Sequence, residues 1–383
     1  MSEREAPAAR GAGWLGELAG AFGDLRTFIP FVLAYISVAK MDPAAVLLGF
    51  GVALIAAGAF YRLPMPVQPM KAIAAAATAQ AGVAVVAPGT IQVAALATAA
   101  VWITLALTGL AKRVAQWVPG SVTLGLVLGL GLALMLQGIK SMASDWPIAL
   151  PLLVAAFVLL SSRRVPVMFL LLAAGIAYAV WHDRDLIEVF GGIRAEFRVP
   201  LPAPGDIDLR GVALGALVLA LPQIPLTLGN AFIATVEQSN RLFPSRPVSE
   251  RGVAATTGLI NLWAAAIGGV PMCHGAGGLA GQVRFGARTG FAPALFGGLL
   301  LLVALFFGDS AEILLRLLPA SVLGVILFLA GAQLALGICD MGPEKNQRFV
   351  AVVTAAFALW NVGLAFLIGL LLHRGLEHGW VRL

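Results

Sequence analysis

The chain has 383 residues, of which 60% are hydrophobic and 11% charged, and its mean hydropathy is +0.93. About a quarter of the residues of a soluble domain are charged, so this composition excludes a soluble protein and predicts an all-α polytopic protein of the lipid bilayer. The net charge of +6 does not indicate nucleic-acid binding, because the Lys and Arg residues are scattered between apolar runs. Two cysteines and four histidines without metal-ligand spacing predict neither a metal site nor a cofactor.

Residues 1–20 begin with a mixture of acidic, basic and proline residues ahead of any apolar run. This pattern is not that of a signal peptide, and we expect a cytosolic N-terminal segment there.

Apolar runs along the rest of the chain predict membrane-spanning segments of about 20 residues. They lie at 25–40, 44–62, 69–87, 90–111, 121–139, 147–162, 165–181, 210–236, 252–269, 275–288, 291–307 and 319–338. The last apolar block, 347–379, is short for two spans and long for one, and we interpret it as two short helices divided near Asn361 and Gly363. These runs give fourteen spans, seven on each side of the polar stretch 183–209. An odd number of spans in each half predicts an inverted repeat.

The charges of the connecting loops predict the orientation, because Lys and Arg in short loops favour the cytoplasmic side. The loops after the fourth, sixth, eighth, tenth and twelfth spans carry basic residues in pairs or groups: Lys112 and Arg113, Arg163 and Arg164, Arg241 with Arg246 and Arg251, Arg284 with Arg288, and Lys345 with Arg348. The opposite loops carry single cations beside acidic residues. Both termini are therefore expected in the cytoplasm, with the 183–209 loop outside.

The third span of each half is interrupted. The first reads Pro-Met-Pro-Val-Gln-Pro-Met-Lys over 64–71, and the second reads Pro-Met-Cys-His-Gly-Ala-Gly-Gly over 271–278. Prolines at these places forbid a continuous helix, and irregular backbone at membrane depth is tolerated where it is buried in protein or lines a cavity. Two half-helices whose N-termini point at one central site would form an anion receptor. The alternative is that glycine and proline only let the helices pack closely.

Five motifs resemble the molybdate-transporter family, a branch of the sulfate-permease superfamily. They are Phe-Gly-Asp-Leu-Arg-Thr-Phe-Ile-Pro at 22–30, the 64–71 and 271–278 segments with Leu-Ala-Gly-Gln following at 279–282, Leu-Gly-Asn-Ala at 228–231 and Arg-Phe-Gly-Ala-Arg at 284–288. The family usually has Gly where this chain has Arg26, so that guanidinium either contacts the anion or occludes the site. The chain ends at Leu383 without the cytoplasmic regulatory domain usual in sulfate permeases, as is typical of the molybdate branch.

The resemblance implies a seven-plus-seven inverted repeat in which a substrate-carrying core moves against a gate. The core would consist of spans 1–4 and 8–11, in residues 21–115 and 210–308, and the gate of spans 5–7 and 12–14, in residues 116–182 and 309–383. The resemblance also implies uptake of molybdate and a homodimer formed through the gates.

In the first half, several side chains are candidates for contact with a tetrahedral dianion, which needs hydrogen-bond donors and compensating charge. Gln68 donates an amide N–H or caps the broken backbone, and Lys71 attracts the anion or pairs with Asp24. Thr27 donates its hydroxyl to the substrate or to its own helix, and Met70 precedes the half-helix. Asp24 pairs with Lys71 or Arg26, or carries a coupled proton.

In the second half, Gln223, Thr227 and Asn230 share one helix face, where they line the cavity or join helices. His274 and Cys273 begin the second half-helix; the imidazole donates to the anion, titrates as a coupling group or is structural, and the thiol is most simply a packing residue. The backbone N–H groups of Gly275, Ala276 and Gly277 are exposed by their small side chains. Glu237, near the cytosolic end of the eighth span, gates or only caps a loop.

These features predict a secondary-active molybdate transporter of the plasma (inner) membrane that works by alternating access and is possibly proton-coupled. Tungstate should be accepted with molybdate because its charge and shape are alike. An anion channel, or a carrier of sulfate or another oxyanion, remains an alternative on the same fold. An enzyme is not expected, because the spans contain no Ser/His dyad, carboxylate pair or metal-ligand set.

Overall fold

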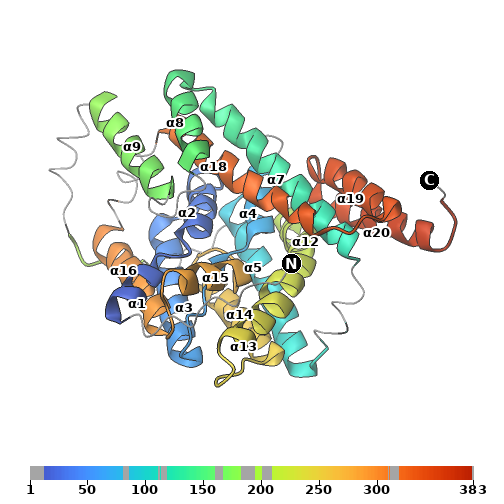
Figure 1. Ribbon diagram of the computed structural model, residues 1–383, viewed down its shortest axis with the longest axis horizontal. Helices are drawn as coiled ribbons and strands as arrows, with labels where there is room; N and C mark the ends of the chain where they lie inside the picture. The colour runs from blue at the N-terminus through green and yellow to red at the C-terminus, as the bar shows by residue number, and fades with distance from the viewer. Residues whose placement is uncertain are drawn as a thin grey trace.

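The computed structural model describes residues 13–80, 86–110, 113, 119–159, 167–182, 195–200, 209–308, 310 and 319–381. Most of them are helical (Figure 1). The first half contains α1 (Trp14–Ala21), α2 (Leu25–Leu33), the π-helix η1 (Ala34–Val38), α3 (Pro43–Tyr61), strand β1 (Gln68–Pro69), α4 (Lys71–Gln80), α5 (Pro88–Thr108), α7 (Gly120–Met142), α8 (Trp146–Leu159) and α9 (Val167–His182). The second half contains α11 (Leu209–Ala213), π-helix η2 (Leu214–Ala220), α12 (Leu221–Leu226), π-helix η3 (Thr227–Ala234), α13 (Thr235–Leu242), α14 (Glu250–Ala266), strand β2 (Met272–Cys273), α15 (Ala276–Arg284), α16 (Phe291–Phe307), α18 (Ala320–Ala335), the 3-10 helix η4 (Leu336–Asp340), α19 (Lys345–Ala358) and α20 (Val362–Glu377).

The predicted spans are confirmed in order, since each apolar run contains one of these helices or a consecutive set of them. The block 347–379 is divided as expected, into α19 and α20. Asn361 is the N-cap of α20, and its Oδ1 accepts a hydrogen bond from Leu364 N at 2.9 Å. The eighth span runs through α11, η2, α12, η3 and α13, so it is helical throughout but passes twice from an α-helical to a π-helical hydrogen-bond pattern.

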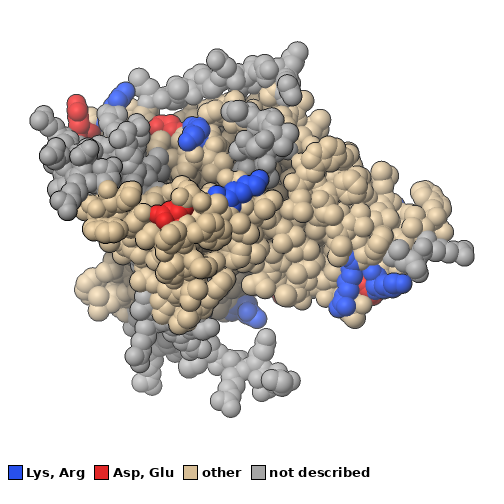
Figure 2. All heavy atoms as spheres, turned by 90° about the horizontal axis from the view of Figure 1, so that it is seen from above, with Lys and Arg blue, Asp and Glu red and all other residues tan. Residues whose placement is uncertain are grey.

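The surface is that of a protein in lipid. Pro43–Tyr61, Pro88–Thr108, Gly120–Met142 and Ala320–Cys339 are each long and apolar enough to cross a bilayer, and the described residues contain five further apolar helices that are shorter. Large apolar side chains face outward, including Leu107, Val158 and Leu371, each at least 72% exposed. On the face seen in Figure 2, charged side chains are few, and most of the described surface between them is uncharged. The chain is therefore an integral membrane protein.

The helix packing follows the inverted repeat. The second span, α3, packs on the eleventh, α16, while the ninth, α14, packs on the fourth, α5. Exchanging the two halves converts the first of these pairs into the second. The fifth and twelfth spans, α7 and α18, are equivalent to each other and cross in a single extended contact that runs diagonally through Figure 1. The predicted repeat is thus present in the contacts as well as in the order of the helices.

Small residues let α7 and α18 approach closely. A Cβ placed on Gly131 would lie 2.7 Å from Gly331 O, and one on Gly138 would lie 2.6 Å from Gly324 O. Backbone contact of this kind is how helices pack in membranes, where neighbouring lipid tails are as apolar as the side chains. The two helices therefore form a rigid layer beside the central elements.

The N-terminal segment expected at 1–20 contains a helix that the apolar pattern did not indicate. Helix α1 packs against α15 and α16, and Glu17, which is 8% exposed, turns inward. Its Oε1 accepts hydrogen bonds from Arg288 N at 2.9 Å and Thr289 N at 3.0 Å. The opposite face of α1 exposes Trp14 and Leu15. Helix α1 is thus attached to the α15–α16 connection by a buried carboxylate.

Candidate functional site

The two interrupted segments meet at the centre of the molecule. Strands β1 and β2 pair in antiparallel fashion, with Gln68 opposite Cys273 and Pro69 opposite Met272. Met70 N donates to Pro271 O at 2.9 Å, which extends the pairing by one bond. The prediction of two half-helices at corresponding places is confirmed. The pairing brings the N-terminus of α4 and the N-terminus of α15 to the same short ribbon.

Two side chains from neighbouring spans hold this ribbon in place. Asn261 of α14 brackets Met272, accepting from its N at 3.0 Å and donating to its O at 2.6 Å. Tyr35 donates its hydroxyl to Met70 O at 2.9 Å. Asn261, Tyr35 and both methionines are buried, so these hydrogen bonds satisfy backbone groups that water does not reach. The ribbon is therefore a fixed platform for the half-helices.

The N-terminus of α4 is closed by a side chain from another span. The first hydrogen bond within this helix runs from Ala74 N to Met70 O, so the N–H groups before Ala74 have no acceptor inside the helix. The side chain of Met70 offers them no strong acceptor. Gln223 of α12 supplies one, its Oε1 accepting from Ala72 N at 2.9 Å and from Ile73 N at 3.4 Å. Its Nε2 donates to Thr227 Oγ1 at 2.8 Å. The helix face predicted from the spacing of Gln223 and Thr227 thus points at the first half-helix.

The N-terminus of α15 is built from glycine instead. Gly275 is the N-cap residue, in extended conformation, and its O accepts from Gly278 N and Leu279 N at 3.1 Å each; no described side chain caps this end. A Cβ on Gly278 would lie 2.5 Å from Gln68 Nε2 and 2.6 Å from Asp24 Oδ2. Glycine is needed here because the first turn of α15 touches these two polar side chains.

Asp24 is the charged group beside α15. Its carboxylate accepts two bonds from Gln68 Nε2, at 2.6 and 2.8 Å, and one from Thr27 Oγ1 at 2.6 Å. Asp24 is 5% exposed and Gln68 is fully buried. Gln68 Oε1 is buried with no described hydrogen-bond partner, and it lies against Gly275. We call Asp24, Thr27, Gln68, Gln223 and Thr227 the central cluster.

Lys71 and Cys273 lie next to this cluster. Lys71 is the first residue of α4 and is partly exposed, while Cys273 is buried opposite Gln68. Lys71 follows Gln68 by three residues, Cys273 is paired with Gln68 in the ribbon, and the amide of Gln68 binds Asp24, so the three groups lie around one residue. A cation, an anion and a helix N-terminus therefore lie within one small region.

His274 follows Cys273 but faces away from the cluster. Its Nδ1 lies 2.9 Å from Pro66 O and its Nε2 lies 2.9 Å from Thr256 Oγ1, which is also 2.6 Å from the Tyr61 hydroxyl. The ring is fully buried. With both nitrogens engaged by the protein, these contacts favour the structural role among the three considered for His274.

The remaining predicted residues are dispersed. Ala276 and Gly277 form the first turn of α15, and a Cβ on Gly277 would meet nothing within 4 Å. Glu237 is exposed on α13. The side chains of Arg26 and Asn230 lie outside the described part of the chain.

Sequence reasoning missed three residues that shape the site, namely Tyr35, Asn261 and Thr256. Each is a hydrogen-bonding side chain inside an apolar run, and Tyr35 is one of only three tyrosines in the chain. A polar side chain in a predicted span was therefore the available signal.

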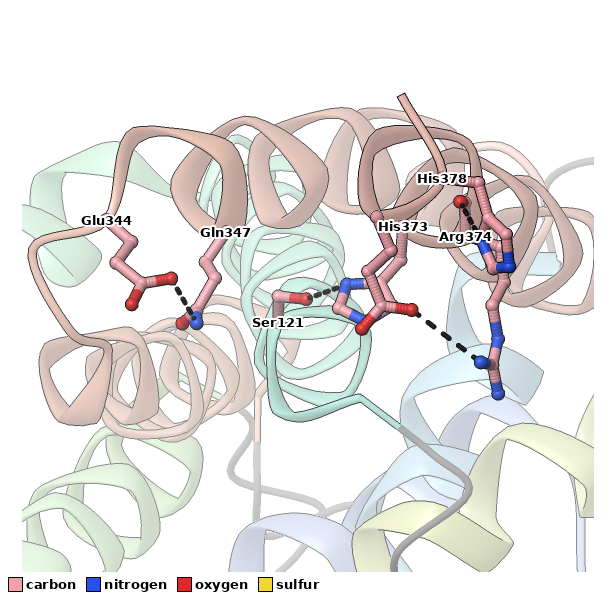
Figure 3. A network of polar contacts seen from close by, with 7 residues as sticks. Ser121, Glu344, Gln347, His373, Arg374 and His378 are labelled. Atoms are coloured by element: carbon pink, nitrogen blue, oxygen red, sulfur yellow. Dashed lines mark hydrogen bonds and ion pairs between the residues drawn. The ribbon is translucent and has the colours of Figure 1, made fainter. Parts of the chain in front are cut away.

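A second polar cluster lies at the N-terminal end of α7, away from the central ribbon (Figure 3). His373 of α20 approaches Ser121 Oγ at 3.4 Å through Nδ1 and Glu377 Oε1 at 3.2 Å through Nε2. A cavity of about 270 Å³ lies beside Ser121, His373 and Gln347. These contacts join α20 to α7, and both helices belong to the predicted gate.

Comparison with known proteins gives consistent matches in sequence and in fold. Residues 16–134 and 215–334, one stretch in each half, match the family described as "Molybdate transporter of MFS superfamily". Molybdate transporter 2 of Arabidopsis thaliana is 32% identical over 93% of this chain and 86% of its own length, and Molybdate transporter 1 of the same plant is 31% identical over 94% and 87%.

Two solved structures share the fold at low sequence identity. The transmembrane domain of a cyanobacterial bicarbonate transporter, BicA, has a TM-score of 0.65 at 18% identity, covering 92% of this chain and 96% of that one. Murine Solute Carrier 26 family member A9, an anion transporter in its inward-facing state, has a TM-score of 0.68 at 13% identity, covering 97% and 69%. The predicted sulfate-permease fold is thereby confirmed.

Proposed function

Because this chain belongs to the molybdate transporter family, we propose that it is a secondary-active carrier that takes up molybdate across the plasma membrane. Family and fold together make it an anion transporter of the membrane.

The observation that carries the proposal is the meeting of two half-helix N-termini at one buried ribbon. Each helix end presents backbone N–H groups and about half a positive charge. An oxyanion between the ends of α4 and α15 would accept hydrogen bonds from both helices, in surroundings where water competes little. Lys71 would add a full positive charge from the first position of α4.

The charges of the site suggest how a dianion is balanced. Among the described groups of the site, the two helix ends contribute about +1 together and Lys71 another +1, while Asp24 subtracts one. Two negative charges on molybdate would therefore exceed what the site supplies, unless Asp24 binds a proton. Protonated Asp24 would keep its place, since a carboxylic acid still accepts from Gln68 and Thr27. We infer that one proton enters with each anion.

Transport would follow from movement of the core against the gate. The two parts meet where α4 and α12 pack on α7, where α2 packs on α18 and where α12 packs on α20. The central cluster is carried by the start of α2 and by β1, α12 and η3, all of which the proposal assigns to the core. A shift of the core would carry the anion from one side of the gate layer to the other. A homodimer through the gates and cytoplasmic termini belong to the same proposal.

The proposed substrate is tested by titration calorimetry with the purified full chain. Molybdate is expected to bind at one site per chain, with tungstate as a competitor and sulfate a weaker one. Binding of sulfate but not molybdate would keep anion transport and reject the proposed substrate. Uptake into proteoliposomes then separates carrier from channel: a carrier accumulates molybdate against its gradient when a proton gradient is imposed, whereas a channel only equilibrates it.

A further inference from the structure

The cap on α4 occupies the N–H groups that the proposed function assigns to the substrate. Gln223 Oε1 accepts from Ala72 N and Ile73 N, at the second and third positions of the helix. Near a helix end, an oxygen of a bound oxyanion would accept from these same donors. The amide oxygen and a substrate oxygen cannot both hold them.

The orientation of this amide follows from its partners. Two backbone N–H groups require an acceptor, which only the oxygen of the Gln223 amide supplies, so its NH₂ group must face Thr227 Oγ1. Gln223 therefore presents to α4 the same chemical group as the substrate does, an oxygen with free lone pairs, but without a charge.

The position of Gln223 makes its displacement feasible. It lies on α12, between the π-helices η2 and η3, and Pro222 and Pro225 on either side of it have no N–H to donate within the helix. π-Helical segments inside a span provide alternative hydrogen-bond registers and are frequent at functional sites. Among the described residues, the NH₂ group of the amide donates to one hydroxyl, that of Thr227.

We propose that Gln223 is an internal surrogate ligand, whose carbonyl closes the N-terminus of α4 in the empty carrier and is displaced when the oxyanion binds. This inference rests on the proposed function and adds a residue that sets its affinity. With the amide in place, Ala72 N and Ile73 N keep an acceptor when the site is empty, and the empty core can return across the membrane without exposing them. The anion must first displace the neutral oxygen of Gln223 from these N–H groups. Its own charged oxygen then forms the stronger hydrogen bond.

The substitution Gln223→Met tests the proposal, because methionine has a similar length and no strong acceptor. Without a competitor at α4, molybdate should bind about 3- to 10-fold more tightly, the equivalent of one ordinary hydrogen bond. The maximal transport rate should fall, since the empty carrier now returns with open N–H groups. Gln238→Met, on α13 of the same span, is the matched control and should change neither value.

If Gln223 instead donates to the anion directly, Gln223→Met must weaken binding, and if the end of α4 is not part of the site, binding stays unchanged. Either result overturns the surrogate role. Should the methionine variant fail to fold, as judged by thermal unfolding without ligand, Gln223→Asn gives the same test: its carbonyl falls one methylene short of α4, so binding should again become tighter. Absence of molybdate binding to the unaltered chain would reject the proposed function itself.

Discussion

The two half-helices are equivalent in the repeat, yet their N-termini are closed by different chemistry. At α4 a neutral amide oxygen from Gln223 accepts from two N–H groups, whereas in the first turn of α15 Gly278 lies against the carboxylate of Asp24. The backbone is symmetric and the side chains are not. An anion bound between the two ends would replace an uncharged group on one side and lie beside a charged one on the other. For the proposed site, we therefore expect the capping amide at the α4 end to affect the affinity for the anion and the carboxylate at the α15 end to affect the charge balance.

The largest effect is expected from crowding the α15 end. In Gly278→Ala, the new Cβ would lie 2.5 Å from Gln68 Nε2 and 2.6 Å from Asp24 Oδ2. Such overpacking costs about 1–3 kcal/mol, and we expect lower thermal stability and loss of molybdate binding. Gly277→Ala is the matched control, since its Cβ meets nothing within 4 Å and the change adds helix propensity. Equal behaviour of the two variants in unfolding and calorimetry would contradict the close packing around Gly278.

A smaller effect is expected from removing the cation at the α4 end. Lys71→Met should weaken molybdate binding about 10- to 100-fold, as for the loss of a hydrogen bond to a charged group. Lys140→Met, at an exposed site near the end of α7, should leave the dissociation constant unchanged. Competition binding measures the dissociation constants of both variants. Wild-type affinity in Lys71→Met would remove this residue from the proposed site.

The charge at the α15 end is tested by pH. If Asp24 must bind a proton before the anion binds, affinity should fall about tenfold for each pH unit as pH rises, in the range where the unbound carboxylate is ionised. Asp24→Asn should make binding independent of pH. Calorimetry in buffers of different ionisation enthalpy should detect one proton taken up per molybdate in the wild type and none in the variant. Glu237→Gln, altering an exposed carboxylate, should retain the wild-type proton uptake; loss of uptake there as well would assign the proton elsewhere.

The smallest effect on binding is expected beside His274. Thr256→Val removes the hydroxyl that contacts both His274 and Tyr61. We expect a stability loss of about 1 kcal/mol, because one buried hydrogen-bond partner is removed. Molybdate affinity should stay within about twofold of the wild-type value. A large change in the dissociation constant would return His274 to the group of substrate-binding candidates.

The fold was predictable from sequence to the level of spans, breaks and symmetry. Hydropathy located the helices, Asn361 marked the division between α19 and α20, and the prolines around Gln68 and Met272 marked the half-helices. These features depend on residues that are near one another in the chain. For the same reason, the spacing of Gln223 and Thr227 indicated a shared helix face.

The partners of the site residues were not predictable in this way. Gln223 is separated from Ala72 by 151 residues, and Gln68 is separated from Asp24 by 44. Such contacts depend on the crossing of spans, which periodicity does not determine. His274 shows the same limit, since its titratable ring suggested a role with the anion. Its contact with Pro66 arises only when the two halves meet, and its contact with Thr256 only when the half-helix segment packs on α14.

The attachment of helix α1 offers a way to follow movement of the protein by experiment. The buried Glu17 fastens the beginning of the chain to the α15–α16 connection, while the other end continues from α20, which is packed on α7 and α19. In the proposed mechanism, the two ends of the chain would therefore belong to different parts, α1 to the core and α20 to the gate. Fluorophores attached at the two ends would change their energy transfer each time the core shifts, which would report turnover in single molecules without a label near the anion.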